Sequence, residues 1–247
     1  MTHNLAEQRR SIRHLLNTHE PGDAMAVYYA FYHPDNKTQL ITYPAGAARA
    51  AGYVAISRTG IDLFRPLITL RFPAGASDAA LEMIYSGIMP GSAAYLSAPA
   101  GYLPLLQAMF TIETEQQLRL YQLRPADFVP VINVLVTQAP TLDGLPRFVV
   151  RSTNPQNRGD VMAWAGLNWQ SPDYAEIAVN TSAQYRQRGY GRSVVAALCQ
   201  HVLNSGRQPL YLVSETNSAS IQLAESLGFH DTGERKLLLE VVLRPRQ

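Results

Sequence analysis

The segment 186–193, RQRGYGRS, constrains the fold of this chain more than any other stretch. It follows a predicted β-strand at 174–182 and precedes a predicted helix at 193–206. The first N–H groups of a helix have no internal partner, and the helix dipole adds partial positive charge there. Gly189 and Gly191 allow the backbone to approach a ligand closely, because no Cβ intervenes. The segment therefore predicts a site for a phosphate or pyrophosphate group.

Two common nucleotide-binding motifs do not fit this segment. A dinucleotide-binding turn requires a third glycine, and Val194 occupies that position. A Walker loop requires a lysine after its last glycine, where this chain has Arg192. The remaining pattern is R-x-x-G-x-G between a strand and a helix, with further positive charge from Arg186 and Arg188.

In this position the R-x-x-G-x-G pattern resembles the coenzyme A pyrophosphate loop of the GNAT N-acetyltransferase superfamily. The segment 217–229, NSASIQLAESLGF, resembles the next helix of that superfamily, with an asparagine at its start and L-x-x-x-L-G-F at its end. A predicted strand at 209–215 lies between the two motifs, as the resemblance requires. The resemblance covers residues 148–242 and implies an α/β fold with a mixed sheet.

The resemblance implies acetyl-CoA as co-substrate and no metal. It also implies that backbone N–H groups of the loop bind the pyrophosphate and that the end of the central strand binds the pantetheine arm, as a peptide adds to a sheet edge. Asn217 is placed near the pantetheine, although it also fits an ordinary helix N-cap, and the two roles are compatible. The expected coenzyme-binding residues are Val179, Asn180, Thr181, Gln187, Arg188, Gly189, Tyr190, Gly191, Arg192, Asn217 and Ser220.

The implied reaction is direct transfer of an acyl group to a primary amine of a small molecule or amino-acid-like acceptor. Glu176 is the candidate base, because a carboxylate in an apolar strand has a raised pKa. The alternative is an ordinary strand residue that faces solvent. Ala224 occupies the position at which many GNAT enzymes carry a tyrosine that acts as the general acid and protonates the leaving thiolate. Substitutes for that acid, each of which also fits a structural role, are Tyr185, Tyr190, Ser214 and His230.

The central strand and loop also resemble the glycine N-acyltransferase-like branch, in which Glu and Thr precede Tyr-Arg-x-x-Gly-Leu. Two departures are present. The spacing from Glu176 to Thr181 is one residue shorter than in that branch, and Tyr190 replaces the leucine. A β-bulge is therefore needed to aim Glu176 correctly. The residues that match in order are Glu176, Thr181, Tyr185, Arg186 and Gly189.

The N-terminal half repeats the order of elements in the C-terminal half. Residues 66–124 are predicted to form strand–helix–strand–helix–strand, and Phe110 aligns with Phe229 without a gap over the last helix and strand. No glycine loop is present in the first half. We expect tandem GNAT-like folds, with a degenerate domain at 1–123 and a domain that carries the coenzyme loop at 124–247. The alternative is two unrelated α/β stretches that share a common order.

Other predictions concern the ends of the two halves. Residues 4–19 are predicted to form an amphipathic helix. An antiparallel meander follows, with strands at 24–32, 38–44 and 51–59. Ser77 is the expected N-cap of a helix at 77–88. A further helix is expected to begin at Asp127, its N-cap, with a buried face formed by Val131, Ile132, Leu135 and Val136.

The composition excludes several classes of protein. Apolar residues make up 47% of the 247 residues, enough for a sizeable core, and the net charge of +2 is too small to indicate nucleic acid as the main partner. The single cysteine, Cys199, lies on the apolar face of a predicted helix and is expected to pack rather than react. With neither a signal-peptide core nor an apolar run of ~18 residues, we expect a cytoplasmic protein without a membrane partner. The oligomeric state stays open.

Three functions compete on the sequence alone. The first is an acyl-CoA-dependent N-acetyltransferase, and the second is a catalytically silent CoA-binding pseudoenzyme that acts as a sensor or interaction module. The third is a different kind of phosphate- or nucleotide-binding α/β protein. Competition of ATP or NAD with CoA distinguishes the third from the others, and turnover on an amine panel separates the first two.

Overall fold

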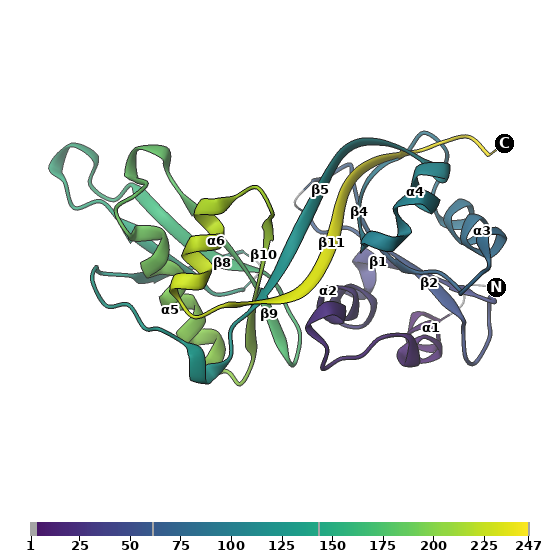
Figure 1. The fold of residues 1–247 in the computed structure, drawn as a ribbon, viewed down its shortest axis with the longest axis horizontal. Coiled ribbons are helices and arrows are strands. Elements are labelled where there is room, and N and C mark those ends of the chain that lie inside the picture. The colour runs from purple at the N-terminus through teal and green to yellow at the C-terminus, as the bar shows by residue number, and fades with distance from the viewer. Residues whose placement is uncertain (1–3, 61, 143, 247) are drawn as a thin grey trace. The chain divides into compact units, whose positions relative to one another are not determined.

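The chain has an α/β fold that divides into two units. Each unit contains residues from both halves of the sequence. The structure is a computed structural model and describes residues 4–60, 62–142 and 144–246. Contacts divide the chain into one unit of residues 1–118 with 235–247 and a second unit of residues 119–234. Two long strands, β5 (Phe110–Gln122) and β11 (His230–Leu243), contribute residues to both units (Figure 1).

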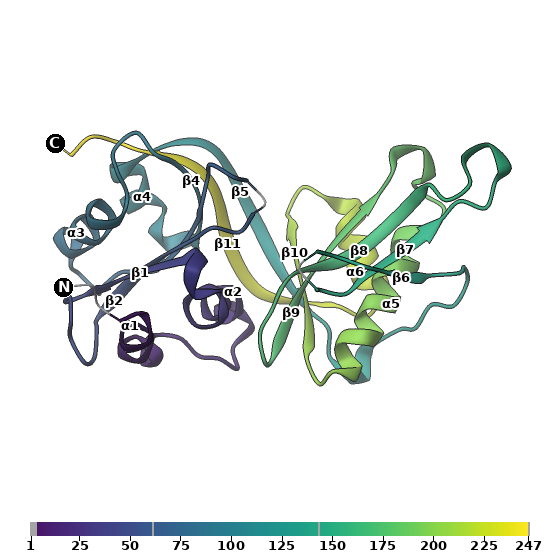
Figure 2. The same cartoon turned by 180° about the vertical axis from the view of Figure 1, so that it is seen from behind.

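The first unit has a mixed sheet in the order β1-β2-β3-β4-β11-β5. One core cluster joins this sheet to α3 and α4, and another joins it to the segments of α1 and α2, so that helices cover both faces (Figures 1 and 2). Its strands are β1 (Thr38–Tyr43), β2 (Gly52–Ser57), β3 (Leu67–Arg71) and β4 (Ala93–Pro99). Its helices are α1 (Leu5–Ser11), α2 (Ala24–Val27), α3 (Ser77–Gly87) and α4 (Leu103–Met109).

The second unit continues from β5 in the order β5-β10-β9-β8-β7-β6. The β9–β10 pair is parallel, and β6 to β9 form antiparallel pairs. Helix α5 packs across β7, β8 and β9. The strands are β6 (Thr137–Ala139), β7 (Arg147–Arg151), β8 (Val161–Gln170), β9 (Tyr174–Thr181) and β10 (Gln208–Ser214), and the helices are α5 (Tyr190–Asn204) and α6 (Ser218–Ser226).

Short helical turns connect these elements. The 3-10 turns are Arg13–Leu15, Pro21–Asp23, Asp35–Lys37, Ala100–Tyr102, Pro125–Asp127, Pro155–Asn157 and Ala183–Tyr185, and Tyr28–Tyr32 is a π-helical turn. Within the described residues, no helix is both long and apolar enough to cross a membrane.

The order of elements predicted from the repeat and the loop is confirmed. In the first half, β3, α3, β4, α4 and β5 follow one another as predicted, and β1 pairs antiparallel with β2. In the second half, the β7–β8 hairpin leads into β9, and α5, β10, α6 and β11 follow. Cys199 is completely buried in the core under α5, as its apolar surroundings predicted.

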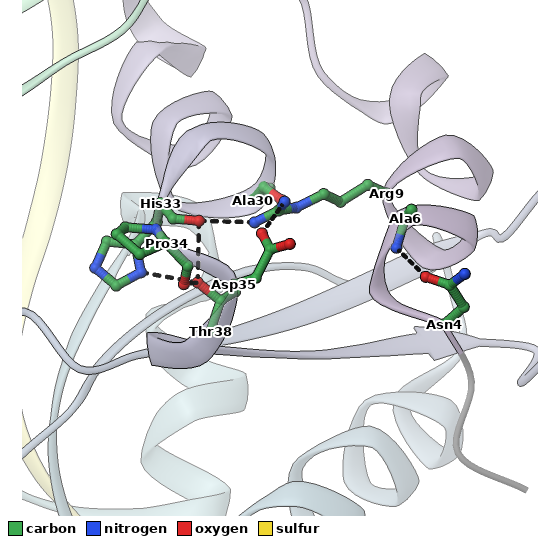
Figure 3. A network of polar contacts seen from close by, with 8 residues as sticks. All are labelled: Asn4, Ala6, Arg9, Ala30, His33, Pro34, Asp35 and Thr38. Carbon is green, nitrogen blue, oxygen red and sulfur yellow. Dashed lines mark hydrogen bonds and ion pairs between the residues drawn. The ribbon is translucent and has the colours of Figure 1, made fainter.

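The strand predicted at 24–32 is wrong, because this segment forms α2 and the π-helical turn Tyr28–Tyr32. Arg9 of α1 stabilises the end of this helical segment (Figure 3). Its Nε donates to the Ala30 carbonyl oxygen at 3.0 Å, its Nη2 donates to the His33 carbonyl oxygen at 2.7 Å, and its Nη1 lies 2.6 Å from Asp35 Oδ1. These bonds satisfy carbonyl groups that a helix end leaves without an internal partner.

Two helix boundaries also differ from prediction. The helix expected at 4–19 ends after Ser11, and the chain continues into the 3-10 turn Arg13–Leu15. Asn4 caps this shorter helix, since its Oδ1 accepts a hydrogen bond from the Ala6 N–H at 3.0 Å (Figure 3). Ser77 is the first residue of α3 rather than its N-cap, and the cap position belongs to Ala76, whose methyl group accepts no hydrogen bond.

The helix expected from Asp127 is also wrong. Only the turn Pro125–Asp127 is helical, and the chain then runs in irregular conformation to β6. The predicted buried face is wrong in part, because Ile132 is 98% exposed and Leu135 is 80% exposed, whereas Val131 and Val136 are partly buried against the core. The cause is local: Pro130 provides no N–H and disfavours a helical conformation at the residue before it, and most neighbouring residues are β-branched.

The C-terminal strand packs with the first unit. β11 pairs antiparallel with β4 from Lys236 opposite Pro99 to Val242 opposite Ala93. Residues 235–247 therefore lie in the first unit by their contacts, although they follow the second half in the sequence. The domains predicted at 1–123 and 124–247 describe two copies of one ancestral fold, and that division stays a prediction.

Candidate functional site

The parallel strands β9 and β10 separate in the middle of the second unit. Their paired residues run from Tyr174 opposite Gln208 to Glu176 opposite Leu210. Beyond this point β9 continues to Thr181 and β10 to Ser214, with no further pairs between them in the part of the chain that the structure describes. The edge of β9 after Glu176 thus offers backbone groups to an extended ligand, which is the geometry of strand addition.

The glycine loop follows directly from this open edge. After Thr181 the chain forms the turn Ala183–Tyr185, and α5 begins at Tyr190. Gly189, the N-cap of α5, has a left-handed φ of 79°, which glycine adopts without steric cost. Gln187 also has a positive φ, 61°, which is uncommon for a residue with a side chain. A loop of this kind at a helix N-terminus is an established form of anion site.

Gly191 allows α5 to pack closely against the end of β9. A Cβ at this position would lie 2.9 Å from Thr181 Oγ1 and 3.3 Å from Leu223 Cδ1. Both distances are shorter than ordinary van der Waals contacts, so any larger residue forces a shift. Gly191 therefore allows the first turn of α5 to lie beside the open edge of β9, because it has no side chain. Gly189 has a different role, since it allows the left-handed backbone conformation of the loop.

The three arginines of the loop have different environments. Arg186 and Arg188 are exposed, and the Arg186 Nε donates to the Thr181 carbonyl oxygen at 3.3 Å. The Arg188 guanidinium lies 5.9 Å from the centre of the Tyr185 ring. Arg192 is directed elsewhere, since its Nη2 donates to the Ser226 carbonyl oxygen at the end of α6 at 3.0 Å. The exposed positive charge of the loop thus comes from Arg186 and Arg188.

Asn133 reaches the same loop and was missed by sequence analysis. Ser193 Oγ lies 2.7 Å from Asn133 Oδ1 and 3.0 Å from the Gly189 carbonyl oxygen. Asn133 Nδ2 lies 3.6 Å from the position of a Cβ at Gly189. No sequence signal identifies this residue, because it belongs to the irregular segment after Pro130 that was predicted to be helical.

Glu176 is buried, with 7% of its surface exposed, so the alternative of a solvent-facing strand residue is wrong. Asn168 Nδ2 donates to Glu176 Oε1 at 2.6 Å, and Trp169 Nε1 donates to Oε2 at 2.8 Å. The β8–β9 register shifts between Leu167 and Trp169, so a bulge lies opposite Glu176. Burial raises the pKa of the Glu176 carboxyl above its usual range, while the two hydrogen bonds lower it.

Each of the four candidate acids contacts other residues of the protein. Tyr185 is buried, and its hydroxyl group is hydrogen-bonded to the Asn157 side chain. The His230 ring lies 3.3 Å from Asp127 Oδ2. The hydroxyl groups of Ser214 and Thr216 lie 3.0 Å apart, and Tyr190 packs partly buried against the core. Ala224, at the usual tyrosine position, is buried in the same core.

Asn217 and Ser220 begin the next helix. Asn217 is the N-cap of α6, because its Oδ1 accepts a hydrogen bond from the Ser220 N–H at 3.1 Å. The prediction of an ordinary N-cap is thus confirmed, while contact with a ligand stays a prediction. Burial raises the pKa of Tyr211 above its usual value, while the Ser220 side chain lowers it.

The separated strands, the glycine loop and Glu176 can be compared with known proteins. Residues 157–237 match the family described as FR47-like protein. A Drosophila protein from a structural genomics consortium has a similar fold, with a TM-score of 0.65 and 15% identity, over 96% of this chain and 88% of that one. A GCN5-related N-acetyltransferase from Sphaerobacter thermophilus has a TM-score of 0.63 and 14% identity, over 99% and 95% of the two chains.

A tandem GNAT protein from the clavulanic acid biosynthesis pathway is also similar. Its TM-score is 0.59 at 13% identity, over 98% of this chain and 95% of that chain. None of the curated proteins matches this chain by sequence. The chain therefore has a GNAT-like mixed α/β fold, and the family match covers the strand, loop and helix that form the candidate site.

Proposed function

We propose that this chain is an acyl-CoA-dependent N-acetyltransferase that acts on a primary amine of a small, amino-acid-like acceptor. The observation that carries this proposal is the separation of β9 from β10 directly beside the glycine loop. An extended amide-containing arm fits along the open edge of β9, and a pyrophosphate fits at the N-terminus of α5. The FR47-like match over 157–237 supports the same reading.

The residues divide the work of binding. Backbone groups of Val179, Asn180 and Thr181 hydrogen-bond the pantetheine arm, and backbone N–H groups from Gln187 to Arg192 bind the pyrophosphate. Arg186 and Arg188 add positive charge at the exposed side of the loop. Arg192 contributes its backbone only, because its side chain bonds to Ser226.

Glu176 acts as the base in this proposal. Its raised pKa suits the removal of a proton from an ammonium group, directly or through water. The neutral amine then attacks the thioester carbonyl, so that a C–N bond forms and the C–S bond breaks. The departing thiolate is a better leaving group than an alkoxide, because thiols are stronger acids, and it takes its proton from water or the acceptor nitrogen.

The architecture completes the proposal. We infer two GNAT-like copies, a degenerate one at 1–123 and a coenzyme-binding one at 124–247, as in the glycine N-acyltransferase-like branch. The shared order of elements in both halves supports this inference. We place the protein in the cytoplasm, with acetyl-CoA as co-substrate and without a metal cofactor.

Thermal unfolding with CoA, acetyl-CoA, ATP or NAD tests the proposal. A ligand at a hundred times its dissociation constant stabilises the native state by ~2.7 kcal/mol. A shift with the CoA species alone supports the proposal, and an amine panel with acetyl-CoA then tests turnover. No shift with CoA, or a larger one with ATP or NAD, refutes it, and binding without any turnover favours the pseudoenzyme.

A further inference from the structure

Arg147, at the start of β7, is a half-buried arginine without a polar partner among the described residues. Its guanidinium carbon lies 4.4 Å from the centre of the Trp164 ring, so the two planar groups are in cation–π contact. Its Nε is buried without a hydrogen-bond partner. None of the residues that the structure describes forms an ion pair or hydrogen bond with this side chain.

Other partly buried arginines of the chain are paired with an acid or with a backbone carbonyl oxygen, as Arg192 is with that of Ser226 and Arg207 with that of Ser171. Arg9 pairs with Asp35, and Arg65 pairs with both Asp62 and Glu240. A guanidinium that loses water without gaining an acceptor is unfavourable, because buried donors that lack a partner retain their desolvation cost. Arg147 differs from these arginines because its guanidinium has no acceptor among the described residues. This difference indicates that a ligand supplies the acceptor for its N–H groups.

A cavity of about 400 Å³ lies beside this arginine, within the second unit. Its lining combines apolar side chains, among them Leu142, Leu145, Pro146 and the Trp164 ring, with a nearly equal share of polar surface. Thr141 also lines the cavity, but its hydroxyl group donates to the Leu145 carbonyl oxygen at 2.6 Å. Arg147 is the charged group among the described lining residues, so the cavity suits an anion attached to an apolar body.

Arg147 shares a sheet face with Glu176. Ala165 and Ile177 belong to the core under α5, so the alternating residues Trp164 and Glu176 point to the opposite face. Arg147 pairs with Gly166, and Gly166 pairs with Ala178, two residues from Glu176. With strands ~4.8 Å apart and a rise of ~3.3 Å per residue, the Cα atoms of Arg147 and Glu176 are ~12 Å apart.

We propose that Arg147 and Trp164 form the subsite that binds a carboxylate group of the acceptor. The two parallel N–H bonds of a guanidinium match the two oxygens of a carboxylate, and the Trp164 ring holds the guanidinium plane in place. In this arrangement the amine of the acceptor lies at Glu176 and its carboxylate lies at Arg147. The apolar part of the acceptor joins the two groups across the same face of the sheet. This assignment to an acceptor rests on the proposed function.

Binding of benzoate and its neutral analogue benzamide tests the subsite directly by calorimetry. The wild type is expected to bind benzoate and to bind benzamide roughly tenfold or more weakly, because a charge-assisted bidentate pair is lost. Arg147→Gln is expected to remove this preference, and Arg147→Lys to retain only part of it. Arg158→Gln, which removes an exposed arginine of the same unit, is the matched control and leaves it unchanged.

A turnover assay with phenylalanine and phenylalaninamide connects the subsite to the acceptor. The wild type is expected to prefer the free carboxylate through a lower KM, and Arg147→Gln to lose that preference. Phenyl phosphate in the binding assay distinguishes a phosphate subsite, and its preference over benzoate contradicts the carboxylate assignment. The inference is also overturned if benzoate does not bind, if benzamide binds equally well, or if Arg147→Gln behaves like Arg158→Gln.

The two proposals fail in different ways. If CoA binds to the wild type but Arg147→Gln changes no preference, the carboxylate subsite is wrong and the proposed function stands. If benzoate binds through Arg147 but CoA does not bind, the proposed function and the assignment to an acceptor are both wrong.

Discussion

Substitution of Gly191 by alanine tests how closely α5 must approach the open edge of β9. The new methyl group would lie 2.9 Å from Thr181 Oγ1 and 3.3 Å from Leu223 Cδ1. Because contacts of this length are repulsive, the first turn of α5 must move away from β9 or the Thr181 side chain must rotate. Either response displaces groups that we assign to coenzyme binding.

The magnitude follows from overpacking. One extra methyl group in a tightly packed site costs about 1–3 kcal/mol. Better helix propensity of alanine over glycine offsets up to about 1 kcal/mol. From the middle of both ranges we expect a net loss of about 1–2 kcal/mol, which corresponds to a decrease of about 2–8 °C in Tm for a chain of this size. Affinity for CoA should fall by roughly tenfold, since about 1.4 kcal/mol of binding free energy is one factor of ten.

Thermal unfolding and calorimetric titration with CoA measure the two effects. The matched control is Gly189→Ala, whose methyl group has an ordinary contact with Asn133 Nδ2 at 3.6 Å and whose cost comes from the left-handed backbone. The double variant Gly191→Ala with Thr181→Ala removes the closest contact and should recover part of the lost stability. If Gly191→Ala is as stable as the wild type, or if Thr181→Ala restores nothing, close packing at Gly191 is not the cause.

Four further predictions concern the base, the loop and the first unit. Glu176→Gln should lower kcat by roughly a hundredfold or more with little change in CoA affinity, and an equal loss of both points to a structural role. The kcat/KM of the wild type should rise as the pH passes the raised pKa of Glu176. Trp169→Phe should move this rise to higher pH, because the substitution removes a hydrogen bond that lowers the pKa. A rise at an unchanged pH contradicts the assignment of Glu176 as the base. Asn133→Asp should weaken CoA binding but not binding of S-acetyl-pantetheine, since the new carboxylate repels only the pyrophosphate; equal losses exclude a role at the loop. Burial, with the charges of Lys37 and Arg9, lowers the pKa of His33 from 6.5 to about 4. The wild type should therefore lose stability relative to His33→Gln as the pH falls from 6.5 to 4. Parallel curves of Tm against pH for the two proteins would contradict this.

The sequence alone determined the features that depend on local spacing. The glycine loop between a strand and a helix, the order of elements in both halves and the N-cap at Asn217 all follow from residues close together in the chain. Such patterns are informative because side-chain periodicity and backbone conformation are properties of short segments. The burial of Cys199 followed in the same way from the apolar face of its helix.

Tertiary structure decided the features that depend on residues distant in sequence. Residues 24–32 are helical where Arg9, more than twenty positions earlier, bonds to the carbonyl groups at their end, and this contact has no local signature. Glu176 receives its two hydrogen bonds from Asn168 and Trp169, at the bulge of the neighbouring strand β8. Asn133 at the loop and the contact of Arg147 with Trp164 likewise join separate segments. Folding sets these contacts because side chains of distant segments meet only when the sheet has formed.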